Sequence, residues 1–239
     1  MTAPETRAPL LSVIVPVYNE RRTIDALLEK VRAVPVDKEI LVVDGASEDG
    51  TREILQRFRD VPRIRLIFQK RRKGRGNALK LGLRLARGQV IIFQDADLEL
   101  DPNDYPALLE PILEDRADVV FGSRFLQEKP RMTFLQYWGN KAINWSVNLL
   151  YRRELGGLWL TDVETCYQVF RRECLKGARI RNNDFAFTVE LTVQLILRGF
   201  RIVEIPISYF PRGRAEGKKI RWADGFASLW TLAKTRITG

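Results

Sequence analysis

The segment VIIFQDADLE, residues 90–99, carries three carboxylates at alternating positions: Asp95, Asp97 and Glu99. It opens with four consecutive apolar residues, which predict a strand buried on both faces. If the extended geometry continues, a spacing of two places the three carboxylates on one side of the chain. Clustered carboxylates need a cation between them, and hard oxygen ligands suit Mg²⁺ or Mn²⁺, which usually arrive with phosphates. Taken alone, the pattern also fits an acidic junction before a helix that starts at Asp101.

The composition excludes several classes of chemistry. No histidine is present, which excludes His-based triads and His-ligated metals, so acid–base chemistry must use carboxylates or an acceptor that is already ionised. The hydrophobic and charged shares, 45% and 29%, are typical of a globular protein, and the length of 239 residues predicts one domain spanning 1–239. A net charge of +10 and a pI near 9.8 favour anionic partners: nucleotides, phospholipid headgroups, lipid phosphates or nucleic acid.

Two further features bear on the compartment. The polar start MTAPETRAP lacks the apolar core of a signal peptide, and no apolar run approaches the roughly 18 to 20 residues of a spanning helix. We therefore expect a cytoplasmic chain that is soluble or lies on the inner face of a membrane. Cys166 and Cys174 have no metal-type spacing, and they are expected to be reduced thiols that serve packing.

Short apolar runs alternate with amphipathic segments through the first half of the chain. The runs predict strands and the amphipathic segments predict helices. The expected strands are 11–17, 39–44, 63–68, 90–95 and 118–122, and the expected helices are 24–31, 51–59, 74–86 and 105–113. This alternation predicts an α/β fold, with a mostly parallel twisted sheet and helices on both faces.

The loops after the expected strands carry side chains suited to a nucleotide, because ligands of open α/β sheets lie beyond the carboxyl ends of strands. Tyr18 could stack on a base and Glu20 could accept from a sugar hydroxyl, although a turn and helix cap explain both when seen alone. Asp44 is placed to accept from a base N–H or a ribose, and a turn-forming Asp is the alternative.

The segment KRRKGRGNA, residues 70–78, joins a basic run to two glycines at an expected helix start. Backbone N–H groups and the helix dipole favour phosphate at such a place. The Walker A order is absent, and a solvated basic turn is the alternative interpretation.

The order of these motifs resembles that of family 2 glycosyltransferases. It runs VIVPVYNE, VVD with SEDGT, GRGNA, DAD and GSR. The later segments TDVETCYQVFRR, FAFTVELTVQLILRG and PISYFPRGRAEGKKIRWADG are similar to the dolichol-phosphate mannose synthase branch and its bacterial polyprenyl-phosphate relatives. The resemblance covers nearly the whole chain after about residue 11. It implies a GT-A (Rossmann-like) fold, with a nucleotide-sugar and metal half at about 11–125 and an acceptor and membrane-facing half at about 126–239.

The resemblance also implies roles for individual residues. The implied donor ligands are Pro16, Tyr18, Glu20 and Asp44 for the nucleoside, with Gly74, Arg75, Asp95 and Asp97 toward the diphosphate. The implied ligands of Mg²⁺ or Mn²⁺ are Asp95, Asp97 and Glu99. Arg124, in the GSR motif, would approach the donor phosphates or the acceptor. Asp162 and Glu190 would contact the sugar, order a basic loop, or act as base if the acceptor is a hydroxyl.

The chain departs from the family pattern in three places. Asp44 is followed by Gly45 and Ala46 where many members have Asp-Asp-Gly, which bears on nucleobase recognition. The usual Gly-Lys-Gly has Arg75 at its centre. A common Gln of the metal loop is Glu99, whose added charge should tighten metal binding.

The basic residues of 198–221 suggest a phosphate acceptor. A sugar hydroxyl normally needs a general base, whereas a phosphate monoester, with a second pKa of about 6, is largely dianionic at neutral pH and needs only cations to hold it. The expected cations are Arg124, Arg212, Arg214, Lys218 and Lys219, and a solvated basic loop is the alternative. Asp97, Arg124, Asp162 and Glu190 are the expected catalytic residues.

Two aromatic-rich helices are expected in the acceptor half. On a helix over 134–151, Phe134, Trp138, Trp145 and Leu149 share one face, while Asn140, Asn144 and Asn148 line another. A second amphipathic helix is expected from Trp222 onward. Tryptophan beside arginine suits a bilayer interface, and ordinary core helices packed on the sheet are the alternative.

The expected reaction is inverting, metal-dependent transfer of a hexose to a polyprenyl or dolichyl phosphate, with GDP-mannose as the first donor by resemblance. UDP-glucose, a UDP-N-acetylhexosamine and a sugar or protein hydroxyl acceptor stay open. A separate membrane-anchoring protein is a possible partner. Nucleic-acid binding rests on charge alone and is not expected, because no helix-turn-helix, RNP-type or zinc pattern is present.

Overall fold

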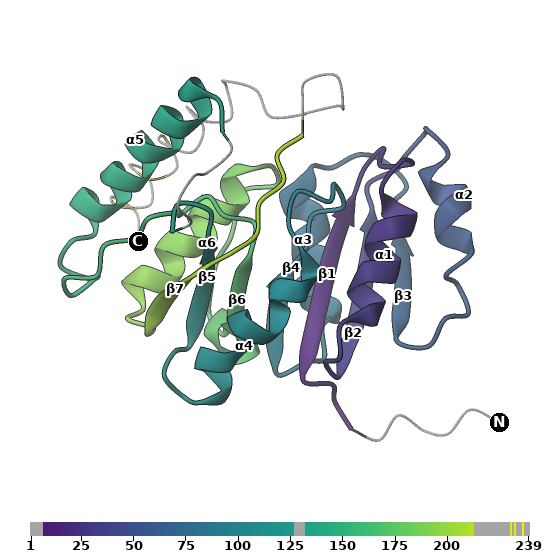
Figure 1. Ribbon diagram of the computed structural model, residues 1–239, viewed down its shortest axis with the longest axis horizontal. Helices are drawn as coiled ribbons and strands as arrows, with labels where there is room; N and C mark the ends of the chain where they lie inside the picture. The colour runs from purple at the N-terminus through teal and green to yellow at the C-terminus, as the bar shows by residue number, and fades with distance from the viewer. Residues whose placement is uncertain (1–6, 127–131, 213–229, 231, 233–235, 237–239) are drawn as a thin grey trace.

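The computed structural model describes residues 7–126 and 132–212 and the single residues 230, 232 and 236. In this part of the chain, seven strands form one sheet in the order β3-β2-β1-β4-β6-β5-β7 (Figure 1). The strands are β1 (Leu11–Val17), β2 (Lys38–Asp44), β3 (Ile64–Phe68), β4 (Val90–Phe93), β5 (Val119–Ser123), β6 (Gln168–Arg171) and β7 (Ile202–Pro206). The helices are α1 (Ile24–Ala33), α2 (Thr51–Gln56), α3 (Arg75–Leu85), α4 (Tyr105–Leu113), α5 (Phe134–Leu150) and α6 (Ala186–Leu197), with short 3₁₀ turns η1 (Pro102–Asp104) and η2 (Arg172–Leu175).

The sheet is mostly parallel, as predicted. β1 pairs in parallel with β2 and β4, β2 with β3, and β5 with β7. β6 is the exception, because it lies between β4 and β5 and runs antiparallel to both. Neither β6 nor β7 was expected from the sequence, since each is short and carries polar residues such as Gln168 and Glu204.

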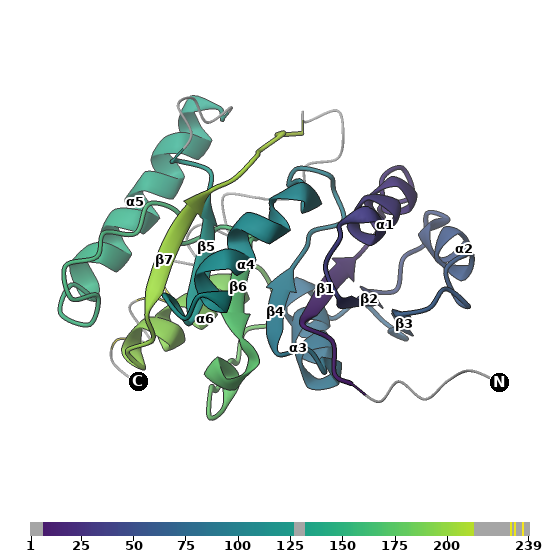
Figure 2. The same ribbon diagram turned by 60° about the horizontal axis from the view of Figure 1, so that its bottom comes forward.

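Alternate residues of the central strands supply two hydrophobic cores, one on each face of the sheet. Val13 and Val15 of β1 face a core shared with α1, α2 and α4, while Ile14 faces a core shared with α3, α5 and α6. This division follows from the period of two along a strand. Figures 1 and 2 show the result, with α1 and α4 on one face and α3 and α6 on the other.

The aromatic-rich helix expected over 134–151 is α5, which lies at the β7 end of the sheet (Figure 1). Thr133 and Gln136 form a reciprocal capping box that fixes its start. The second amphipathic helix lies outside the described residues, apart from Trp230, Leu232 and Arg236, which are helical. None of the helices in the described part of the chain combines the length and apolarity that crossing a bilayer requires.

Candidate functional site

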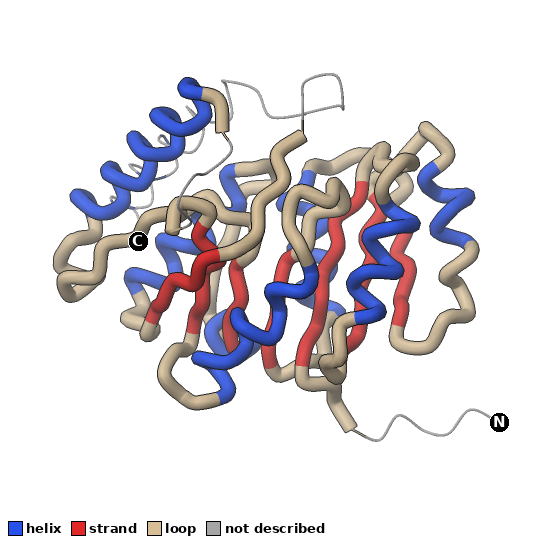
Figure 3. The backbone as a smooth tube through the Cα atoms, viewed as in Figure 1, coloured by secondary structure: helices blue, strands red, loops and turns tan. Residues whose placement is uncertain are grey.

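The loops that leave β1, β2, β4, β5 and β7 gather at one edge of the sheet, the upper edge in Figure 3. Parallel strands end at the same edge, so side chains from distant parts of the sequence meet there. Hydrogen bonds join the loops after β1 and β2: the Asn19 N–H donates to the Ser47 hydroxyl, and the Glu20 N–H donates to the Thr51 hydroxyl, each at 2.9 Å. This edge therefore holds the predicted donor-binding loops in fixed relation.

The acidic loop after β4 does not continue the strand, which corrects the extended geometry expected for residues 95–99. β4 ends at Phe93, the chain turns at Ala96 and Asp97, and Leu98 adopts a left-handed φ of 61°. The turn forms because the Asp97 carboxylate accepts the N–H of Glu99 at 3.2 Å. Among the described residues, no three acidic or cysteine side chains already converge as a metal cluster.

The charges of the acidic loop nevertheless fit a cation. Burial raises the pKa of Asp97 to about 7, and the charges of Asp95 and Glu99 act in the same direction. The carboxyl groups of this loop offer oxygen ligands of the kind that Mg²⁺ and Mn²⁺ prefer, and a cation among them would offset the repulsion that opposes the ionisation of Asp97. Beneath the loop, the buried hydroxyls of Tyr105 and Tyr167 both donate to Gln94, at 2.7 and 2.6 Å, and fix the end of β4.

Arg75 lies directly on the acidic loop. It donates from Nε and Nη2 to Oδ1 of Asp95 at 2.9 and 2.8 Å, and from Nη1 to the Thr188 hydroxyl at 3.0 Å. Its side chain is only 11% exposed, so this is a largely buried ion pair. The arginine in place of the family's usual lysine thus uses its planar fork to bond two partners at once.

Close packing leaves no room for a side chain at either of the two glycines beside Arg75. Gly74 has a φ of 93°, and a Cβ there would lie 2.2 Å from the carbonyl oxygen of Asn183; a Cβ on Gly76 would lie 2.6 Å from Cβ of Phe187. The Asn183 carbonyl also accepts the N–H of Asn77 at 3.0 Å. The segment before α6 therefore covers part of the N-terminus of α3, where the sequence predicts a phosphate-binding site. The donor-binding role of Gly74 and Arg75 stays a prediction.

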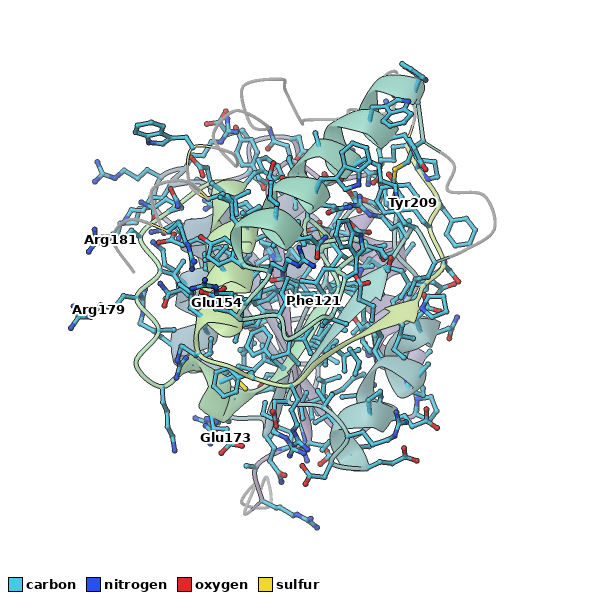
Figure 4. The ribbon with its side chains drawn as sticks, turned by 90° about the vertical axis from the view of Figure 1, so that its left-hand side faces the viewer. Phe121, Glu154, Glu173, Arg179, Arg181 and Tyr209 are labelled. Carbon is cyan, nitrogen blue, oxygen red and sulfur yellow. The ribbon has the colours of Figure 1, made fainter. Side chains whose placement is uncertain are left out.

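Glu190, a predicted catalytic residue, holds that covering segment. It is buried in α6, and its carboxylate accepts the N–H groups of Arg181 and Asn182 at 2.9 to 3.1 Å and the Asn182 amide at 2.8 Å. Arg181 lies on this segment in Figure 4. The contacts favour the loop-ordering role among the three that the sequence left open.

Three of the four residues predicted to hold the nucleoside, Tyr18, Glu20 and Asp44, contact an arginine. Asp44 is buried, accepts the N–H groups of Ala46 and Ser47, and accepts from Nε of Arg52 at 2.6 Å. The guanidinium of Arg72 lies 4.4 Å from the centre of the Tyr18 ring. Pro16 is within β1 and pairs with β2.

Arg124 and Asp162 form a buried pair at the end of β5. The Asp162 carboxylate is fully buried and accepts from N, Nε and Nη2 of Arg124 at 3.0, 2.7 and 2.7 Å. Glu204 of β7 in turn accepts the N–H groups of Thr161 and Asp162 at 2.8 to 2.9 Å. Glu204 thus fixes the backbone at Asp162, and the Asp162 carboxylate fixes the guanidinium of Arg124. This arrangement suits orienting a cation better than abstracting a proton.

The asparagine face of α5 supports the same pair. Asn140 accepts from Nη2 of Arg124 at 3.2 Å. Asn144 and Asn148 are buried, and they accept the N–H groups of Val163 and Leu160 at 3.0 and 2.8 Å. The predicted division of α5 into an asparagine face and an aromatic face is confirmed, and the asparagine face fixes the segment that contains Asp162.

The segment after β7 lies across the acidic loop. The Arg212 guanidinium donates to Oε2 of Glu20 at 2.9 and 3.0 Å and, through Nε, to the Asp97 carbonyl at 2.6 Å. Arg212, predicted as an acceptor ligand, therefore contacts two predicted donor-side residues. The other three predicted acceptor cations, Arg214, Lys218 and Lys219, lie outside the described residues.

Three residues that lie at this site, Cys166, Glu204 and Tyr209, were not predicted to belong to it. Cys166 lies beside Asp95, and burial followed by the Asp95 charge raises the pKa of its thiol well above the usual range. Both cysteines are free, as predicted, and the raised pKa agrees with a packing role. Glu204 and Tyr209 were also missed. Glu204 had a usable signal, because a carboxylate within the apolar run IVEIP needs a buried partner.

Comparison with known proteins places this architecture. Residues 12–177 match glycosyl transferase family 2. The undecaprenyl-phosphate mannosyltransferase of Micrococcus luteus is 30% identical over 94% of this chain and 97% of its own length. The polyprenol monophosphomannose synthase of Mycolicibacterium smegmatis is 30% identical over 92% of this chain and 86% of its own length.

The fold has solved counterparts. A crystal structure of glucosyl-3-phosphoglycerate synthase from Mycobacterium tuberculosis, in complex with Mn²⁺, UDP and phosphoglyceric acid, superposes with a TM-score of 0.72. It is 20% identical and covers 95% of this chain and 78% of its own, which supports the GT-A fold alone. The family match over most of the chain and the two relatives aligned along nearly their whole lengths give the classification: the chain is a glycosyltransferase and belongs to glycosyl transferase family 2.

Proposed function

We propose that this chain transfers a hexose, mannose from GDP-mannose in the first instance, to a polyprenyl or dolichyl phosphate. The observation that carries the proposal is the alignment with the Micrococcus luteus undecaprenyl-phosphate mannosyltransferase, because it spans 97% of that enzyme. In this proposal the donor binds in the half at about 11–125 and the acceptor in the half at about 126–239.

The donor side uses the acidic loop. Asp95, Asp97 and Glu99 would hold Mg²⁺ or Mn²⁺, which when bound neutralises the donor diphosphate and stabilises it as a leaving group. The raised pKa of Asp97 supports this assignment, since crowded carboxyl groups gain most from a cation. Tyr18, Glu20 and Asp44 orient the nucleoside, and a nucleotide that reaches Glu20 competes there with Arg212.

The acceptor side uses Arg124. The Asp162 carboxylate and the Asn140 side chain fix its guanidinium through Nε and Nη2, and both Nη1 hydrogens lack an acceptor in the described part of the chain, so an anion could accept them. A phosphate oxygen held there attacks the anomeric carbon and forms the new C–O bond, while the bond to the donor diphosphate breaks and its electron pair leaves with the nucleoside diphosphate. The configuration inverts. No side chain needs to remove a proton, consistent with a chain that has no histidine.

The aromatic face of α5 is the proposed contact with the membrane that carries the acceptor. Phe134, Trp138, Trp145 and Leu149 on this face are 78%, 47%, 54% and 75% exposed. Exposed tryptophans beside Arg152 and Arg153 fit the interface of a bilayer with anionic lipids. This arrangement would hold the enzyme peripherally at the cytoplasmic face.

A sugar-transfer assay tests the proposed function. Radiolabelled GDP- and UDP-sugars are offered with Mg²⁺ or Mn²⁺ and a polyprenyl phosphate in detergent, with Asp97→Ala as the control. Label that enters the organic phase identifies the donor and supports the lipid-phosphate acceptor. Metal-dependent hydrolysis of the donor without a lipid product would refute the acceptor and point to a hydroxyl acceptor instead.

A vesicle assay tests the membrane contact separately. Trp138→Ser with Trp145→Ser should lower binding to anionic vesicles several-fold, whereas activity on a detergent-dispersed acceptor should hold. Leu113→Ser, an exposed apolar residue of α4 that is 57% exposed, is the matched control and should leave vesicle binding unchanged. Equal losses in both variants would refute the docking role of α5.

A further inference from the structure

Tyr209 lies between the two halves of the proposed site. It belongs to the segment that leaves β7, where Figure 4 labels it. Its hydroxyl donates to Oε2 of Glu99 at 3.1 Å, and its ring centre lies 5.5 Å from the guanidinium carbon of Arg124. One side chain therefore contacts a predicted metal ligand with its polar end and a predicted acceptor ligand with its face.

The backbone fixes where this side chain lies. Leu100 and Tyr209 form an antiparallel bridge, and the Phe210 N–H donates to the Glu99 carbonyl at 2.8 Å. The Arg212 N–H donates to Oε1 of Glu99 at 2.9 Å. The segment 209–212 thus bonds both oxygens of the Glu99 carboxylate, one through the Tyr209 hydroxyl and one through the main chain.

We propose that Tyr209 is a positioning residue that orients Glu99 toward the metal through its hydroxyl and orients Arg124 toward the acceptor phosphate through its ring. The inference rests on the proposed function. The hydroxyl contacts Glu99 and the ring contacts Arg124, so removing the hydroxyl alone and removing the whole aromatic ring should have different effects.

The two contacts have different physical consequences. Partners that hydrogen-bond a metal-ligating carboxylate fix its orientation, and their removal typically lowers metal affinity about 10- to 100-fold. A guanidinium over an aromatic face is held by the ring's electron density, which a phenylalanine retains and a leucine lacks. Tyr209→Phe should therefore affect only the metal side, and Tyr209→Leu should affect both sides.

Tyr151 offers a matched control away from the site. Its hydroxyl donates to the Leu232 carbonyl at 3.0 Å, and the Arg236 guanidinium lies 5.3 Å from its ring centre. Tyr151→Phe and Tyr151→Leu therefore remove the same kinds of contact and report the cost to folding alone. Thermal unfolding of all four variants identifies any loss that comes from instability.

The experiment measures the two sides independently. Mn²⁺ is titrated by calorimetry in the presence of GDP, and the KM for polyprenyl phosphate is measured at saturating Mn²⁺ and donor. Tyr209→Phe should weaken Mn²⁺ binding at least about tenfold and leave the acceptor KM unchanged. Tyr209→Leu should weaken Mn²⁺ binding to the same extent and raise the acceptor KM several-fold, while the Tyr151 variants match the wild type in both.

Wild-type Mn²⁺ affinity in Tyr209→Phe, or an equal rise of acceptor KM in both Tyr209 variants, would overturn the inference. The Mn²⁺ titration requires no transfer reaction. A wild-type protein that binds Mn²⁺ with GDP but glycosylates no lipid phosphate would contradict the proposed function and overturn the acceptor half of the inference, while the titration still decides the Glu99 half. A wild-type protein that binds no Mn²⁺ would overturn both.

Discussion

Replacing one partner of the Arg124–Asp162 ion pair should lower the free energy of unfolding by more than the loss of its hydrogen bonds alone. Asp162 has no exposed side-chain surface and Arg124 is 15% exposed, so each is the other's main compensation for lost hydration. Breaking a buried pair by removing one partner typically costs about 3–5 kcal/mol, because an uncompensated charge remains. Asp162→Asn keeps one carbonyl oxygen for the Arg124 hydrogen bonds, so we expect a loss near 3 kcal/mol; Arg124→Gln leaves a buried carboxylate and should cost about 4 kcal/mol.

The double variant is the decisive one. With both charges gone, Arg124→Gln with Asp162→Asn should lose about 4 kcal/mol, well short of the sum of the single losses, which gives a coupling energy of roughly 3 kcal/mol. Urea unfolding of the four proteins, followed by fluorescence of the tryptophans, measures the cycle. Additive losses would refute the reasoning. Transfer activity should fall in all three variants, and a fall greater than the loss of folded protein would separate the functional from the structural contribution.

Three further outcomes are expected. Gly74→Ala should cost at least about 2 kcal/mol in urea unfolding, because φ is 93° and the new Cβ would lie 2.2 Å from a carbonyl oxygen. Gly139→Ala should not destabilise, because a Cβ there meets nothing within 4 Å beyond its chain neighbours and the backbone of its own helix. A hydrogen bond from Arg201 lowers the pKa of Asp118, so its stabilisation is complete above the unfolded pKa near 4 and is lost as pH falls through the folded pKa. Asp118→Asn should lose less than about 1 kcal/mol at pH 7, and its difference from the wild type should shrink steadily as pH falls below about 4. Asp97→Ala should abolish metal-dependent turnover and leave the circular dichroism spectrum unchanged, and retained activity would contradict the metal assignment.

The first half of the fold followed from local patterns. Runs such as Leu11–Val17 and Val90–Phe93 are apolar without interruption because both faces of a central strand are buried, and the sequence alone reveals that. Helix α5 was predicted from the sequence, together with its aromatic face and its asparagine face. β6 and β7 could not be predicted in the same way, because they owe their pairing to neighbours far along the chain: Val169 to Ile92 and Val120, and Val203 to Val120.

The residue types of the candidate site were visible in the sequence, but their contacts were not. The spacing of Asp95, Asp97 and Glu99 identified the acidic loop, yet the turn at Asp97 depends on one side-chain hydrogen bond that period-two reasoning ignores. Glu190 and Asp162 have the acidity of candidate bases. Only the fold reveals that their oxygens accept from backbone N–H groups and arginine, which suits positioning.

A net charge of +10 suggested free cations awaiting an anion, but several arginines of the site already have partners. Arg52 contacts Asp44, Arg75 contacts Asp95, and Arg212 contacts Glu20, at 2.6 to 2.9 Å. A nucleotide sugar that binds these carboxylates must exchange ion pairs, so its affinity depends on the difference between old and new contacts rather than on gross charge. Arg124 differs, because its Nη1 hydrogens point to no described acceptor while Asp162 fixes its other nitrogens. Arg124 is therefore paired like the other three arginines, but it is the one whose Nη1 group has no acceptor among the described residues, and this is what the proposed acceptor role requires.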